Sequence, residues 1–177
     1  DYTYYIVVEN ICNEWGVRSY LLSSTRESQI PVEETYLKTA TVNGKSIEVI
    51  FLKSKEDDFG YYEIYKGTRE KGNYKFLTKI SNIDDTVFVD NNVNVNTTSY
   101  CYQVRVVDDC GHLSSFSNNG CTIVIRGETL NKKSEVPRFK FDLRWDDYIT
   151  WDGGVMDYEL LRSLDTGSLR PTIRLAD

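Results

Sequence analysis

The stretch YCYQVRVVDDCGHLSSFSN, from Tyr100 to Asn118, indicates the fold of this 177-residue chain. Its first half alternates aromatic or β-branched residues with polar ones, which is the pattern of a half-buried strand. The pattern breaks at Asp-Asp-Cys-Gly-His, where Gly111 supplies the backbone freedom that a tight turn needs. A run of serines follows, and an apolar stretch resumes at Cys121. These features predict an antiparallel hairpin.

The same pattern occurs near the start of the chain. YYIVVENICNEWGVRSY aligns with YQVRVVDDCGHLSSFSN at an offset of 98 residues, so Tyr4 matches Tyr102. A second match, at an offset of 96, pairs Tyr62 with Tyr158, and VIF aligns with LRW upstream of them. Two matches at nearly the same period predict tandem modules of just under one hundred residues.

These matches define the expected domain boundaries. Residues 1–28 are expected to form the last hairpin of a first module, and residues 29–127 a complete second module. Residues 128–136 have the composition of a linker, and residues 137–177 should be the opening strands of a third module. Because a lone hairpin is only marginally stable in water, both end pieces should belong to neighbouring modules.

The composition favours strands and argues against some partners. Aromatic residues make up 13% of the chain, which holds 13 tyrosines and one methionine, and tyrosine, threonine and valine favour strands. The net charge is -6 and no stripe of lysine or arginine occurs, which argues against nucleic acid as a partner. No apolar run approaches the roughly 18 residues of a membrane span, so we expect no membrane insertion.

The motifs resemble those of a fibronectin type III domain. Leu143 and Trp145 match the Leu-x-Trp of that family's second strand, and the Tyr-x-Val-x-Val that begins at Tyr102 matches its sixth strand. The central module departs from the family by carrying Phe51 in place of the tryptophan. The resemblance implies an all-β fold, an immunoglobulin-like seven-stranded β-sandwich in tandem, with partial modules at both ends of the chain.

A narrower resemblance is to the repeats of gliding-motility-associated surface proteins of Bacteroidetes, which the type 9 secretion system exports. It rests on Tyr-Cys-Tyr, Asp-x-Cys-Gly, Ser-Asn and Cys-Thr-Ile between Tyr100 and Ile123, and on LRWDDYITWDGGVMDYE, which begins at Leu143. It implies a non-catalytic, secreted or cell-surface segment, a stalk or adhesive region used in gliding or attachment. The implied partners are neighbouring modules, the secretion machinery or outer-membrane surface proteins, and glycans.

The cluster of Asp108, Asp109, Cys110 and His112 has the residue types of a metal or catalytic site. A zinc site needs about four converging ligands, but no C-x-x-C motif accompanies the cluster and the chain has one histidine. The matching stretch NICNEWG keeps the cysteine and lacks the histidine. The sequence also lacks nucleophile-elbow, zinc-protease and phosphate-loop motifs. We therefore expect a hairpin turn, and no catalytic residue, metal or cofactor.

The cysteines suggest a covalent link across this hairpin. Cys101 and Cys121 lie ten residues on either side of Gly111, so in a hairpin centred there they would face each other. A non-hydrogen-bonded pair is close enough for a disulfide, which suits an oxidising extracellular setting; buried free thiols are the alternative. Cys12 and Cys110 occupy equivalent positions and remain for further disulfides or as free thiols.

Two further features concern modification and ligands. Asp85-Thr86-Val87 resembles the Asp-Thr-apolar acceptor of Bacteroidetes O-glycosylation, which makes Thr86 a candidate site. Pairs of acidic residues lie in predicted turns and could bind a calcium ion between modules. Six aromatic residues could form a sugar-stacking platform, although strand alternation favours packing: Tyr61, Tyr65, Tyr74, Phe76, Tyr148 and Trp151. The alternative function is accordingly an accessory or carbohydrate-binding module of a secreted polysaccharide-degrading enzyme.

Overall fold

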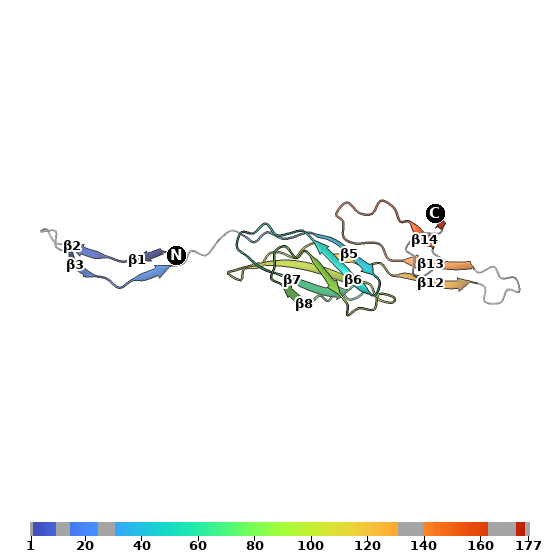
Figure 1. Ribbon diagram of the computed structural model, residues 1–177, viewed down its shortest axis with the longest axis horizontal. Helices are drawn as coiled ribbons and strands as arrows, with labels where there is room; N and C mark the ends of the chain where they lie inside the picture. Colours follow the sequence, from blue (N-terminus) through green and yellow to red (C-terminus); the bar gives the residue numbers. More distant parts are fainter. Residues whose placement is uncertain (1, 10–14, 25–30, 131–139, 163–172, 176–177) are drawn as a thin grey trace. The chain divides into compact units, whose positions relative to one another are not determined.

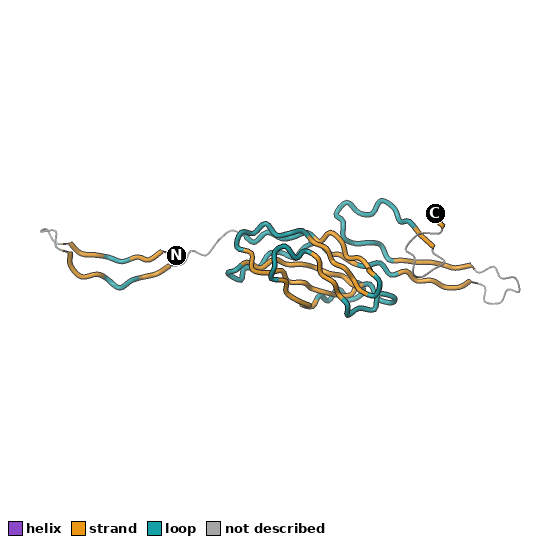
Figure 2. The backbone as a smooth tube through the Cα atoms, in the orientation of Figure 1, coloured by secondary structure: helices purple, strands orange, loops and turns teal. Residues whose placement is uncertain are grey.

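The structure is a computed structural model that describes residues 2–9, 15–24, 31–130, 140–162 and 173–175. Every regular element in these ranges is a β-strand and every strand pair is antiparallel, so the described part of the chain is all-β (Figure 2). Among the described residues, no helical segment has the length and hydropathy needed to span a membrane. The chain divides into two compact units, Asp1–Pro31 and Val32–Asp177.

The first unit contains two short ladders. Their four strands are β1 (Tyr2–Tyr4) paired with β4 (Leu22–Ser24), and β2 (Val7–Glu9) paired with β3 (Trp15–Arg18). Where the ladders meet, the Ile6 N–H donates to Ser19 Oγ at 2.8 Å, and the Ser19 N–H donates to the Ile6 carbonyl at 2.9 Å. A serine side chain therefore takes the place of one backbone acceptor in this hairpin.

Two antiparallel sheets form the body of the second unit (Figure 1). The three-stranded sheet has the order β5-β6-β9, with bounds Leu37–Asn43, Ser46–Phe51 and Val87–Asp90. The four-stranded sheet has the order β11-β10-β7-β8, with bounds Gly120–Cys121, Tyr100–Asp108, Phe59–Thr68 and Lys75–Ile80. Buried side chains from both sheets form one core, so the two sheets pack as a β-sandwich.

The core follows from strand alternation. In β6 every second side chain is buried, and Ile47, Val49 and Phe51 take those positions. The central strand β10 supplies three further buried side chains from one face. The main core residues of the two sheets are Leu37, Ala40, Ile47, Val49 and Phe51 in one, and Tyr62, Ile64, Tyr102, Val104 and Val106 in the other. Alternation along the strands therefore places these side chains in the interior.

The dipeptide Asn43-Gly44, a common signal of a tight hairpin turn, lies at the end of the hairpin of β5 and β6. β5 and β6 pair in a ladder that ends at Asn43↔Ser46, so the loop consists of Gly44 and Lys45. Gly44 has a φ of 63°, in the left-handed region that glycine adopts without a steric penalty. The asparagine is thus the last strand residue, and the turn lies one position later than the dipeptide signal suggests.

The serine run that follows β10 is held by side-chain hydrogen bonds. The Val106 N–H of β10 donates to Ser114 Oγ at 2.9 Å. The Val104 N–H donates to Ser117 Oγ at the same distance. The N–H groups of the two serines donate to the carbonyls of the same two valines, at 2.9 and 2.8 Å. This irregular segment therefore satisfies the edge of β10 without being a regular strand.

Two buried tyrosine hydroxyls are hydrogen-bonded. The Tyr62 hydroxyl accepts the Ser54 N–H at 2.7 Å and donates to the Ile83 carbonyl at 3.0 Å. The Tyr102 hydroxyl donates to Asp90 Oδ2 at 2.9 Å. Burial, followed by the bond to Asp90, raises the pKa of Tyr102 well above its usual value. Both phenols therefore stay neutral and anchor loops to the core.

Asp90 is the buried acid at the end of β9. The Lys66 ammonium lies 2.7 Å from its Oδ2, and the Asn92 N–H donates to its Oδ1 at 2.9 Å. Burial acts to raise the pKa of Asp90, but Lys66, Asn92 and Tyr102 outweigh it and hold that pKa below its usual value. The ionised carboxylate therefore stabilises the folded state.

Four more strands follow the sandwich. They pair as two hairpins: β12 (Ile125–Leu130) with β13 (Lys140–Trp145), and β14 (Leu160–Arg162) with β15 (Ile173–Leu175). The ladder of β12 and β13 is continuous from Ile125↔Trp145 to Leu130↔Lys140. The expected linker, residues 128–136, thus begins inside a strand at residues 128–130, because these residues have a partner in β13. Residues 131–136 lie outside the described residues.

We expect the free energy of unfolding to fall in acid, and to fall less in the variant Asp90→Asn. The folded-state pKa of Asp90 lies below the value in the unfolded chain, which is roughly 3.9. Its contribution is therefore complete above that pH and is lost as the pH falls through the folded-state pKa. Urea unfolding at a series of pH values, followed by fluorescence, measures the difference.

The matched control for this prediction is Asp57→Asn, at an exposed acid in a loop. It should show the same loss of stability in acid as the parent chain. An unchanged pH dependence in Asp90→Asn would contradict the assignment of Asp90 as a stabilising buried acid.

Candidate functional site

The structure contains a disulfide between Cys101 and Cys121. The two cysteines are directly opposite each other in the ladder of β10 and β11, and both are buried. The Thr122 N–H donates to the Tyr100 carbonyl at 2.9 Å, next to the pair. Cys101 and Cys121 thus occupy a non-hydrogen-bonded position, where opposed Cα atoms approach most closely. The bond joins the short edge strand β11 to the centre of its sheet.

Next to the disulfide, the side-chain amide of Asn118 links three parts of the chain. Its Oδ1 accepts the Leu37 N–H at 2.8 Å, and its Nδ2 donates to the Leu37 carbonyl at 3.0 Å. The same Nδ2 donates to the Thr150 carbonyl at 2.6 Å. Asn118 therefore ties the first residue of β5 to a loop that lies far downstream in the sequence.

Backbone groups make further contacts to the same loop. The Cys121 N–H donates to the Ile149 carbonyl at 2.9 Å, and these two residues form an isolated β-bridge. The Trp151 indole N–H donates to the Lys38 carbonyl at 3.0 Å. We call the contact between these two groups of residues the junction. One group is residues 146–151, and the other is Leu37, Lys38, Asn118 and Cys121.

Aromatic and ionic contacts surround the junction. The rings of Tyr148 and Trp151 pack edge to face with centroids 5.0 Å apart. Arg126 donates to both carboxylate oxygens of Asp146 at 3.1 Å, and the Arg69 guanidinium donates to the Asp147 carbonyl. Because most acceptors here are main-chain carbonyls, the contact depends mainly on the path of the loop.

The Asp-Asp-Cys-Gly-His segment forms a turn that Asp108 closes. Asp108 Oδ1 accepts the His112 N–H at 2.7 Å, and its Oδ2 lies 2.7 Å from His112 Nδ1. Gly111 has a φ of 89° and donates its N–H to the Asp108 carbonyl at 3.1 Å. Burial acts to raise the pKa of Asp108, but the hydrogen bonds from His112 outweigh it and hold that pKa below its usual value. The carboxylate therefore works as a turn cap.

The same turn brings three metal-ligand types together. One ligand atom each from Asp108, Cys110 and His112 lies within 4.8 Å of the others. Zinc sites need about four ligands, and both carboxylate oxygens of Asp108 are already engaged by His112. The positions of the Asp108 and His112 side chains are thus explained by the turn. Cys110 is a free, exposed thiol, and Cys12 lies outside the described residues.

The six aromatic residues noted in the sequence lie in different places. Tyr65 packs edge to face against Phe76, with centroids 5.8 Å apart, on the four-stranded sheet. Tyr61 is contacted there by the Lys79 ammonium, 3.8 Å from the ring centroid. The Tyr74 hydroxyl donates to Asn119 Oδ1 at 2.9 Å. Tyr148 and Trp151 belong to the junction, so the six do not form one platform.

Sequence reasoning missed Phe116, which completes the aromatic face of the sheet. Its ring lies 5.0 Å from that of Tyr65, and the Arg105 guanidinium stacks 4.9 Å from its centroid. Arg105 also binds Glu63 at 2.6 Å. Burial acts to raise the pKa of Glu63, but Arg105 and Tyr65 outweigh it and hold that pKa low. Phe76 and Phe116 are both exposed above this ion pair.

Thr86 directly precedes β9. Its N–H donates to the Asp84 carbonyl at 3.0 Å, and its carbonyl accepts the Phe51 N–H at 3.1 Å. The residue is partly buried and follows the exposed Asp85. O-glycosylation at Thr86 remains a prediction.

Several contacts of the sandwich recur elsewhere in the chain. The pair of hydrogen bonds between Val104 and Ser117 recurs between Ile6 and Ser19, 98 residues earlier. In both places the serine Oγ also donates to the carbonyl of the following residue, at 2.9 and 3.0 Å. The two hairpins thus share local geometry as well as sequence.

A second set of contacts recurs downstream. In the sandwich, the rings of Phe51 and Tyr62 pack with centroids 4.9 Å apart, and the N–H three residues after Phe51 donates to the Tyr62 hydroxyl. Downstream, Trp145 and Tyr158 lie 6.0 Å apart, and the N–H three residues after Trp145, that of Tyr148, donates to the Tyr158 hydroxyl at 2.7 Å. β13 and the segment that leads into β14 therefore repeat this arrangement of β6 and β7.

Comparison with known proteins finds likenesses among solved structures alone. No family model matches the chain, and no curated protein sequence does. A fibronectin type III-like protein from Clostridium thermocellum is similar over 54% of this chain and 93% of its own, with 21% identity and a TM-score of 0.43. Pectate lyase PelI from Erwinia chrysanthemi is similar over 50% of this chain, with 19% identity and a TM-score of 0.43.

A β-1,2-glucanase from Parabacteroides distasonis is similar over 58% of this chain, with 20% identity and a TM-score of 0.46. The chain spans only 28% of the pectate lyase and 14% of the glucanase. Likenesses of this extent assign no activity to the chain.

We expect non-reducing peptide mapping to recover Cys101 linked to Cys121, with Cys110 open to alkylation. Replacing both linked cysteines by alanine should lower the free energy of unfolding by about 2–4 kcal/mol, because the cross-link closes a loop of 20 residues. Thermal or urea unfolding with and without reductant measures the change.

Cys110→Ser is the control for this prediction, and reductant should destabilise it as much as it destabilises the parent chain. Recovery of Cys101 and Cys121 as free thiols from oxidised protein would refute the link.

Proposed function

We propose that the chain is a non-catalytic spacer built from tandem immunoglobulin-like modules of the fibronectin type III class. The observation that carries this proposal is the recurrence of the same hydrogen bonds at equivalent positions. β5 to β11 form one complete seven-stranded sandwich. β12 to β15 are the opening strands of the next module, and residues 2–24 are the closing hairpin of another.

The junction gives such a spacer a defined geometry where two modules meet. Interfaces between domains of one chain are often mobile unless they are extensive. Here Asn118 and Cys121 donate hydrogen bonds to one loop, and Trp151 of that loop donates to Lys38. The disulfide holds β11, which carries one of these donors, in place. Successive modules would therefore keep a fixed spacing and direction.

We place this spacer outside the cell, as a stalk or adhesive region of a surface protein. A disulfide persists in oxidising surroundings and is rare in reducing ones, and a net charge of -6 suits a soluble exposed segment. The resemblance of the sequence to gliding-motility-associated repeats supports export by the type 9 secretion system and a role in gliding or attachment. Neighbouring modules and outer-membrane surface proteins are then the expected partners.

A carbohydrate-binding or accessory module of a secreted polysaccharide-degrading enzyme is a second candidate. It is favoured by the exposed rings of Phe76 and Phe116 on the outer face of the four-stranded sheet. Aromatic rings are common sugar-stacking surfaces because their flat apolar faces pack against the C–H groups on one face of a sugar ring. Binding on a glycan array that is lost in Phe76→Ala and kept in Leu113→Ala would favour this candidate over a passive spacer.

We expect Asn118→Ala to loosen the junction while the core stays folded. The substitution removes the bonds to Leu37 and Thr150 and leaves their backbone groups unpaired, at a cost of about 1–3 kcal/mol. Faster hydrogen exchange at the Cys121 amide and the Trp151 indole, measured by NMR, is the expected result. Asn91→Ala, at an exposed asparagine outside the junction, should leave both rates unchanged.

We expect an antibody against residues 32–130 to label intact cells of the source organism. Labelling should disappear in cells that lack the type 9 translocon and should be restored by complementation. Retention of the protein inside wild-type cells would defeat the surface assignment. Labelling that persists without the translocon would defeat the export route alone.

A further inference from the structure

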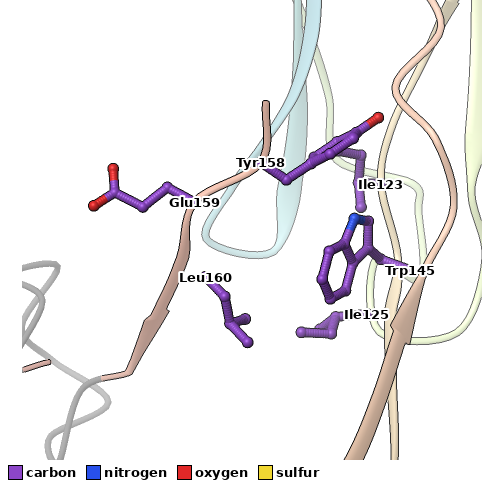
Figure 3. A pocket seen from close by; sticks show the side chains of 6 residues that line it. All are labelled: Ile123, Ile125, Trp145, Tyr158, Glu159 and Leu160. Carbon is purple, nitrogen blue, oxygen red and sulfur yellow. The ribbon is translucent and has the colours of Figure 1, made fainter. Parts of the chain in front are cut away.

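Two hollows in the second unit differ in their charge. One is lined by apolar side chains such as Ile125 and Trp145, and its charged lining residue, Glu159, points away from it (Figure 3). The other has a volume of about 450 Å³ and is formed by the end of β7, the start of β8 and the turn between them, together with Tyr100 of β10. We call it the lysine groove, because three lysines line it: Lys66, Lys71 and Lys75.

The hairpin of β7 and β8 carries a local excess of positive charge. Residues 66–79 hold five of the chain's 21 lysines and arginines, but only one of its 27 aspartates and glutamates, Glu70. The hairpin is therefore a basic patch on a chain whose net charge is -6. Charge that is segregated in this way attracts an anionic ligand to one face of the molecule.

The three lysines of the groove are not equivalent. The Lys66 ammonium lies 2.7 Å from Asp90 Oδ2 and donates to the Asn92 carbonyl at 2.8 Å, so its charge is used within the fold. Lys71 and Lys75 are exposed, and within the described residues their ammonium groups have no ion-pair or hydrogen-bond partner. Two positive charges at the groove are therefore available to a ligand.

The turn that carries Lys71 is held in place by hydrogen bonds. The Thr68 carbonyl accepts the Lys71 N–H at 3.2 Å and the Gly72 N–H at 2.9 Å. Gly72 has a φ of 57°, in the left-handed region that glycine adopts readily. The Tyr74 hydroxyl donates to Asn119 Oδ1 at 2.9 Å, which fixes the far side of the turn. A ligand would therefore meet a turn that is already ordered, which lowers the entropy cost of binding.

We propose that the lysine groove binds an acidic polysaccharide, whose carboxylate or sulfate groups pair with Lys71 and Lys75 while a sugar ring packs on Phe76. Phe76 lines the groove and is 50% exposed, so one flat apolar face is open to a sugar. The volume of the groove lies within the range of roughly 300–1,000 Å³ that is usual for ligand sites. The proposal names a ligand for the adhesive region proposed above and rests on that surface role.

The place of the groove in the sheet favours a polysaccharide over an acidic peptide. β8 is an edge strand, because it ends the order β11-β10-β7-β8, and it carries Lys75 and Lys79. Lysines on an edge strand discourage pairing with the backbone of another chain, and strand pairing is the usual way in which an extended peptide binds such an edge. A polysaccharide requires no strand pairing, and the groove offers it spaced charges beside an aromatic ring.

Isothermal titration calorimetry of the full chain with polygalacturonate and with dextran sulfate tests the proposal, and neutral dextran is the uncharged control. At least one acidic polymer should bind, neutral dextran should not, and the affinity should fall as the salt concentration rises. Binding of polygalacturonate alone would identify carboxylates as the recognised groups, and binding of dextran sulfate alone would identify sulfates.

The double variant Lys71→Gln, Lys75→Gln should bind about threefold to tenfold more weakly, the range expected for the loss of two exposed ion pairs. Phe76→Ala should also weaken binding. The matched control is the double variant Lys45→Gln, Lys55→Gln, which removes the same charge at exposed lysines outside the groove and should bind as the parent chain does. Near-ultraviolet circular dichroism should show an intact sandwich in every variant.

Three results would overturn the proposal. The first is a parent chain that binds neither acidic polymer. The second is an equal loss of affinity in the two double variants, because net charge alone would then explain binding. The third is binding of poly-L-glutamate or duplex DNA as tight as that of the polysaccharides. The spacer function would survive each of these results, because the exchange rates at the junction test it separately.

Discussion

The antiparallel ladder between β7 and β10 is the contact on which the rest of the structure depends. It runs from Tyr100↔Thr68 to Asp108↔Phe59 and forms the centre of the four-stranded sheet. One face of the ladder supplies Tyr62 and Val104 to the core. One end of β10 carries the disulfide, and the other carries Asp108 and its turn. A shift of one residue in this ladder would turn the core face of β10 outward.

The hairpin after β10 shows how far sequence reasoning extends. Its strand, its turn at Gly111 and the pairing of Cys101 with Cys121 follow from alternation and from symmetry about the glycine. Close to the turn, however, Val107 pairs with Leu113, which centres the hairpin on Cys110 instead. The irregular serine segment absorbs the difference before Cys121, because hydroxyl oxygens replace backbone acceptors there. Composition alone does not reveal such substitutions.

The junction could not be found from the sequence. Asn118 and Thr150 are 32 residues apart, and each is one polar residue among many in a loop. Strand alternation has a period that can be recognised, whereas a loop contact depends on where the folded strands bring two chain segments together. The same limit applies to residues 128–130, whose place in β12 is decided by their partners in β13. Phe116 was likewise missed, because it lies in the serine run, outside any regular strand.

The recurrence of hydrogen bonds is a more discriminating sign of repetition than the recurrence of residues. A match of tyrosines and valines can arise from β-propensity alone. A tyrosine hydroxyl that accepts the N–H three residues after an aromatic of the preceding strand requires a defined loop path and a defined strand position. In the sandwich the Tyr62 hydroxyl also has a second partner, because it donates to the Ile83 carbonyl. The Tyr158 hydroxyl accepts the corresponding N–H downstream, that of Tyr148, so the two places share a loop path and not merely a residue type.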